Sequence, residues 1–191
     1  MRKWGLSYGT DDMCDHGGDE TLALLENIII HGSLYAVIVN LYLFAIMVTL
    51  SPRIWAYADY PKSITDRVPP QTSREKKIGG VIMIPFFILV LGLPVLSSIM
   101  LEISYGGAIS FSDAFLNIYG ILLIGNISEV LIIDLLIVGT ITPDFVVIPG
   151  TENLKNTEYK AFRLHHAKSH IRAIIAMAIV GLVLAEIIVL V

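Results

Sequence analysis

Three polar side chains lie deep inside the longest apolar stretch of this 191-residue chain. The stretch runs from Ala114 to Thr142 and carries Asn126, Glu129 and Asp134 well away from its ends. A carboxylate surrounded by hydrocarbon is costly unless a partner or a wet cavity receives it. We therefore expect these side chains to face other helices, with Asp134 and Glu129 as candidate catalytic acids or hydrogen-bond acceptors.

The spacing of these residues determines which of them can act together. Glu129 and Asp134 are five positions apart, so about 140° separates them on an α-helix. Asn126 and Glu129 are three positions apart and share one face. The spacing predicts two polar layers between helices and argues against a paired-carboxylate site formed by Glu129 and Asp134 alone.

Helical rise converts sequence position into depth. Asp134 lies about 12 Å above the inner end of its helix, and Asn40 about 15 Å above the same end of the first helix, so the two are candidate partners. Glu129 lies about 20 Å up, level with His31 and Glu186, and either of these is a candidate partner for it. The candidate ligand-binding residues of the two layers are Asn40, Asn126 and His31.

The first hydrophobic helix has a polar face of its own. Asn27, His31 and Tyr35 follow an i, i+4, i+8 spacing, and in a membrane this face is expected to turn toward other helices. His31 is either a neutral, hydrogen-bonded residue near the outer interface or a functional group.

Two histidines suggest a metal site. His166 and His170 are four residues apart, which lets two imidazoles on one helix face bind one ion, and Glu152 or Asp144 could supply an oxygen ligand. A divalent metal is therefore a candidate cofactor, and His166 is also a candidate general base. The alternative is an interfacial helix whose histidines and lysines meet lipid headgroups.

The composition is that of a membrane protein. Hydrophobic residues make up 55% of the chain, charged residues only 16%, and the mean hydropathy is +0.74. The single cysteine, Cys14, excludes an intramolecular disulfide and a cysteine-based zinc or iron–sulfur site. The sequence has no nucleotide-binding glycine motif, haem-attachment motif or convincing nucleophile–base pair. We expect membrane lipid as a partner and no nucleic acid.

The apolar pattern predicts an all-α, polytopic integral membrane protein with four transmembrane helices and two structured cytoplasmic loops. A polar, acidic tail over 1–20 precedes the four-helix domain, 21–191. Pro85 and Pro94 are expected to bend the second helix. The spans are expected at about 27–50, 79–103, 114–142 and 172–191, and the loops at 51–78 and 143–171.

Basic residues set the expected orientation. The stretches 51–78 and 144–172, which cover the two long loops, hold eleven of the thirteen Lys and Arg residues. The positive-inside rule therefore places both loops in the cytoplasm and both termini on the outer side of the cell membrane (inner or plasma membrane). Arg53, at the exit of the first helix, is either a clamp for an anionic lipid headgroup or a charge that sets the topology.

Several motifs resemble a family of small bacterial and archaeal membrane proteins. They are SPRIW followed by DYP, VPPQT and REKK, and then ITPDFVVIPGTE, which together span most of the chain from Leu41 to His170. The resemblance implies the four-helix architecture and a single surface formed by the two cytoplasmic loops. The family has no established activity, so the resemblance transfers no catalytic residue.

Three functions fit these observations. The first is a binding protein or enzyme for a lipid or apolar small molecule, with a polar site between helices near the cytoplasmic interface. The second is a proton-coupled transport component, which with only four helices would need a homo-oligomer. The third is a structural or accessory subunit of a membrane complex, in which polar residues hold helices together.

Overall fold

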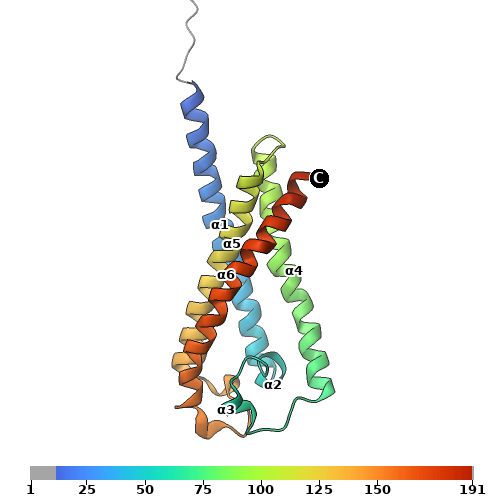
Figure 1. Ribbon diagram of the computed structural model, residues 1–191, viewed down its shortest axis with the longest axis vertical. Helices are drawn as coiled ribbons and strands as arrows, with labels where there is room; N and C mark the ends of the chain where they lie inside the picture. The colour runs from blue at the N-terminus through green and yellow to red at the C-terminus, as the bar shows by residue number, and fades with distance from the viewer. Residues whose placement is uncertain (1–11, 191) are drawn as a thin grey trace, which may run out of the picture.

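The computed structural model describes residues 12–190, with the side chains of 20–161 and 169–190, and this part of the chain is helical with no strand. Four long helical segments lie side by side (Figure 1). They are α1 (Asp12–Thr49), α4 (Ser73–Ser104), α5 (Phe111–Glu129) continued by the π-helix η1 (Val130–Ile141), and α6 (Glu158–Leu190).

Each of the four segments is long and apolar enough to cross a membrane. The qualifying stretches are Glu20–Thr49, Ser73–Ser104, Phe111–Ile141 and Ser169–Leu190. Many of their large apolar side chains are exposed, as expected for surfaces that meet lipid. The all-helical prediction is confirmed, and the fold is compatible with a multi-pass membrane protein.

Three helices begin earlier than the apolar pattern suggests. Helix α1 starts at Asp12, inside the predicted tail, where acidic residues favour a helix N-terminus. Helix α4 starts at Ser73 because Thr72 and Glu75 form a capping box: the Thr72 hydroxyl accepts from the Glu75 N–H at 3.2 Å, and the Glu75 carboxylate accepts from the Thr72 N–H at 2.6 Å. Helix α6 runs unbroken from Glu158 and joins the expected interfacial helix to the fourth span.

The two long loops pack against each other at one end of the bundle, and the C-terminus and the start of α1 lie at the other end (Figure 1). The loops contain the short helices α2 (Pro52–Trp55), α3 (Lys62–Thr65), η2 (Asp144–Val146) and η3 (Glu152–Leu154). The Tyr60 hydroxyl donates to the Val146 carbonyl at 2.6 Å, and the Ser63 hydroxyl donates to the Glu158 carboxylate at 2.6 Å. The loops therefore form one surface.

Close approach of α1 and α5 depends on small residues. A Cβ atom at Gly125 would lie 2.1 Å from Cε1 of Tyr35, and one at Gly120 would lie 2.8 Å from Cγ2 of Ile28. Tyr35 is only 5% exposed, so its face of α1 turns toward the other helices as predicted. The two helices cannot pack this closely if Gly125 carries a side chain.

We predict that Gly125→Ala lowers the free energy of unfolding in detergent by about 1–3 kcal/mol, because the Tyr35 ring must move away from the new methyl group. Gly92→Ala is the matched control, since a Cβ atom there meets nothing within 4 Å and alanine is the better helix former. Equal unfolding free energies for the two variants would contradict this packing.

Candidate functional site

The π-helix changes which side chains share a face. In a π-helix each N–H bonds the carbonyl five residues back, and the Thr142 N–H does so with Ile137 at 2.8 Å. Residues five apart are thus brought onto one side of the helix. The angle of about 140° between Glu129 and Asp134 assumed α-helical geometry, whereas with the π-helix η1 following Glu129 both residues line the same cavity.

The η1 segment ends in a defined cap. Thr142 adopts the left-handed conformation with φ 48°, which is uncommon for a residue with a side chain. Its hydroxyl donates to the Val138 carbonyl at 2.8 Å, and the side chain is buried. Pro143 follows and cannot continue the helix, so the chain turns from η1 directly into the loop surface.

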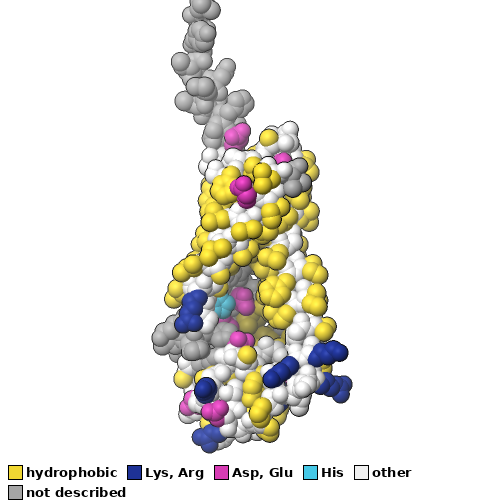
Figure 2. All heavy atoms as spheres, turned by 45° about the vertical axis from the view of Figure 1, so that its right-hand side comes forward, with side chains coloured by type: hydrophobic (Ala, Val, Ile, Leu, Met, Phe, Trp, Pro, Cys, Tyr) yellow, Lys and Arg dark blue, Asp and Glu magenta, His cyan; other side chains and the backbone are white. Residues whose placement is uncertain are grey.

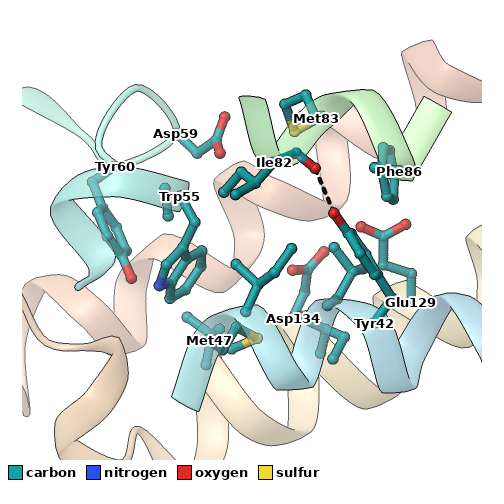
Figure 3. A pocket seen from close by; sticks show the side chains of 15 residues that line it. Tyr42, Met47, Trp55, Asp59, Tyr60, Ile82, Met83, Phe86, Glu129 and Asp134 are labelled. Carbon is teal, nitrogen blue, oxygen red and sulfur yellow. Dashed lines mark hydrogen bonds between the residues drawn. The ribbon is translucent and has the colours of Figure 1, made fainter. Parts of the chain in front are cut away.

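The cavity has a volume of about 230 Å³ and lies between α1, α4, η1 and the first long loop. Figure 3 shows Glu129 and Asp134 reaching it from one side and Met83 and Phe86 from α4. Its walls combine carboxylates with aromatic and aliphatic groups. The polar and aromatic lining residues are Tyr42, Trp55, Asp59, Tyr60, Phe86, Glu129 and Asp134.

A hydrogen bond joins α1 to α4 at the edge of this cavity. The Tyr42 hydroxyl donates to the Ile82 carbonyl at 2.5 Å (Figure 3). The carbonyl lies in the turn before Pro85, a proline that removes one backbone donor from α4. The contact ties this turn of α4 to α1 and thereby helps to hold the cavity wall.

Asp134 meets a histidine from α6. His170 Nε2 lies 2.6 Å from Asp134 Oδ2, and His170 Nδ1 lies 2.8 Å from Asn126 Oδ1. The Asp134 and His170 side chains are only 5% and 14% exposed. A doubly protonated ring offers one proton to each oxygen. A neutral ring can serve both contacts if the Asp134 carboxyl is protonated or if the Asn126 amide turns its NH₂ group toward Nδ1. The three side chains form one buried chain of polar contacts across two helices.

The other predicted partners lie elsewhere. Asn40 donates to Ser128 Oγ at 2.9 Å and to the Ala36 carbonyl, so it bonds the residue beside Glu129 and not Asp134. His31 lies 2.7 Å from Ser97 Oγ of α4. Glu186 is exposed on α6 and lies about 24 Å of helical rise beyond His170, too far along α6 to meet Glu129.

A second polar cluster in the half of the bundle away from the loops was missed by the sequence analysis. Asn27 donates to Ser97 Oγ and to Asn117 Oδ1, both at 2.8 Å, and Asn117 donates to Ser98 Oγ at 2.9 Å. Asn117 and Ser98 are fully buried. The signal was present, since Asn117 interrupts an apolar stretch and the serine pair follows Pro94.

Arg53 has a role different from the expected lipid clamp. Its guanidinium binds Glu75 bidentately at 2.7 and 3.1 Å and donates to the carbonyls of Pro69 and Pro70 at 3.0 and 3.1 Å. The carboxylate of Glu75 raises the pKa of Arg53. Arg53 therefore fastens the first loop to the start of α4, with four of its five N–H donors bonded within the protein.

The predicted metal ligands do not come together among the described residues. Both ring nitrogens of His170 contact protein groups. Glu152 accepts two hydrogen bonds from the Gly150 N–H at 2.9 and 3.1 Å, which lowers its pKa. The side chain of His166 lies outside the described residues. Within 20–161 and 169–190, no group of three His, Cys, Asp or Glu side chains could hold a metal.

We predict that His170→Ala destabilises the protein by about 3–5 kcal/mol, because it removes the partner of a buried carboxylate. In the double variant Asp134→Asn/His170→Ala, the loss in free energy of unfolding is expected to be at least about 0.5 kcal/mol smaller than the sum of the losses in the two single variants. Unfolding free energies in mixed micelles provide the double-mutant cycle. Glu186→Gln, an exposed change on the same helix, is the control, and strictly additive effects would show that the two side chains are not coupled.

No family model, no curated protein and no solved structure matches the chain. The cavity and the side chains that line it are therefore the basis on which a function is proposed.

Proposed function

We propose that the protein is an integral membrane protein that binds a lipid or another apolar small molecule in the cavity between α1, α4 and η1. The observation that carries this proposal is the pairing of aromatic and aliphatic walls with a carboxylate, Asp134, that a histidine holds in place. Small-molecule sites are typically apolar and carry a few well-placed polar groups. In the proposed orientation the loop surface is cytoplasmic and the cavity lies near that interface.

Access from the side supports a membrane-borne ligand. Figure 2 shows a hollow in the half of the molecule nearer the loops, with histidine (cyan) and carboxylate (magenta) side chains inside it and apolar side chains (yellow) beside it. A molecule dissolved in the hydrocarbon layer could enter there without crossing water. A cavity of about 230 Å³ holds part of an acyl or prenyl chain or one small ring system, and not a whole phospholipid.

Asp134 would meet any hydrogen-bonding group on the part of the ligand that lies in this cavity. Because His170 contacts Asp134 from α6 and is itself held by Asn126, the carboxylate is held ready to accept a hydrogen bond or a proton. Glu129 lines the same cavity and comes from the same helical segment, α5 continued by η1. If the protein is an enzyme, these two are its candidate acid and base, with His170 as a positioning residue.

A structural or accessory subunit is the second candidate. The cluster of Asn27, Ser97 and Asn117 favours it, because within the described part of the chain these side chains bond to one another, to Ser98 and to His31, and join three helices. Partners in this case are a second copy of the chain or other subunits of a membrane complex. The two functions differ in whether anything enters the cavity.

Photolabelling tests the proposed function. We would reconstitute the protein in nanodiscs with a neutral monoacylglycerol that carries a diazirine in its acyl chain, and map the labelled residues by mass spectrometry. We expect label on the cavity residues Ile46 and Ile82. In Met83→Trp, whose indole would fill the cavity, we expect about fivefold less label, which corresponds to a loss of about 1 kcal/mol of binding free energy.

Val81→Trp is the matched control for this experiment. Val81 lies on the same helix, is 56% exposed and lines none of the cavities described here. If the label spreads evenly over outward faces and the two tryptophan variants behave alike, the cavity does not bind the chain and the structural alternative is favoured.

A further inference from the structure

A second cavity adjoins the first on the side of the loops. It has a volume of about 250 Å³ and lies between α2, the first loop and the start of α4. Trp55, Ile82 and Met83 line both cavities, so the two spaces share a wall and follow one another along α4. An elongated molecule that passes over the shared Trp55, Ile82 and Met83 side chains would lie in both cavities.

The second cavity differs in charge from the first. Among the described residues that line it, Lys76 is the only charged one, whereas Asp59, Glu129 and Asp134 line the first cavity and not this one. Lys76 is exposed and makes no ion pair within the described part of the chain. An ammonium group offers three N–H donors to a phosphate or carboxylate.

The fold sets the position of Lys76. The carboxylate of the neighbouring Glu75 is occupied by Arg53 and Thr72, so it is engaged away from Lys76. Gly79, three residues further and on the same helix face, packs so closely on α2 that a Cβ atom there would lie 2.8 Å from the Ile54 carbonyl oxygen. This contact holds the Lys76 face of α4 against the cavity.

Aromatic side chains complete a setting typical of a headgroup layer. Trp55 and Tyr57 line the second cavity, and such amphipathic rings favour the membrane interface. The indole N–H of Trp55 donates to the Leu50 carbonyl at 3.2 Å, which fixes the ring. Lys and Arg side chains (dark blue) also lie on the loop side of the hollow in Figure 2.

We infer that the second cavity is a headgroup subsite for an anionic amphiphile. The phosphate or carboxylate of the ligand binds Lys76, and its chain runs past Trp55, Ile82 and Met83 into the first cavity. This inference rests on the proposed function and names the class of ligand for that site. In this proposal Lys76 binds the anionic group of the ligand, the role for which Arg53 was one candidate in the sequence.

Two probes with the same chain test this inference: a diazirine-bearing lysophosphatidic acid, and the monoacylglycerol described above, which lacks the phosphate. In nanodiscs of zwitterionic lipid we expect the phosphate probe to label the cavity residues about fivefold more efficiently, since one interfacial lysine contributes about 1 kcal/mol. Lys76→Gln should remove this preference and leave labelling by the neutral probe unchanged. Lys77→Gln, the same charge change at a residue that lines neither cavity, should keep the preference.

The outcomes separate the two proposals. Equal labelling by the two probes, or equal effects of Lys76→Gln and Lys77→Gln, would overturn the headgroup subsite while the cavity still binds a chain. Absence of cavity labelling by both probes would overturn the proposed function itself. Inorganic phosphate is a further arm: if it displaces the phosphate probe at millimolar concentration, the subsite binds free phosphate and the lipid assignment is wrong.

Discussion

The buried contact between Asp134 and His170 determines how α6 packs against η1. A carboxylate among apolar helices needs a partner, and the 2.6 Å contact with His170 supplies one. The imidazole also contacts Asn126, so its ring cannot turn without losing one of two buried polar contacts. Helix register, ring orientation and the direction of the carboxylate therefore depend on one another.

The π-helix and the loops convert this contact into a cavity. With one extra residue in each hydrogen-bonded turn, η1 brings Glu129 and Asp134 onto the side that faces α1 and α4. The first loop closes the end of the space with Trp55 and Tyr60, and the Tyr60 hydroxyl is tied in turn to Val146 of the second loop. The loop surface thus forms one wall of the site.

The sequence was sufficient for much of the fold and for little of the site. Length and hydropathy located four helices, and the spacing of Asn27, His31 and Tyr35 identified the inward face of α1. The π-helix left no clear signal, because Val130–Ile141 reads as an ordinary apolar helix with no proline or glycine until Gly139. His170 was interpreted as a metal ligand or as part of an interfacial helix, because its contact with Asp134 depends on how α6 docks, which no local pattern encodes.

The most direct test of this account is the distance between the Asp134 carboxyl carbon and His170 Nε2, measured by solid-state NMR on protein labelled with ¹³C in Asp side chains and ¹⁵N in His rings. The account predicts strong carbon–nitrogen dipolar dephasing of the Asp134 signal, consistent with the 2.6 Å contact between nitrogen and oxygen, and its loss in His170→Gln. An Asp134 signal that shows no dephasing in the wild type, or the same dephasing in both proteins, would contradict it.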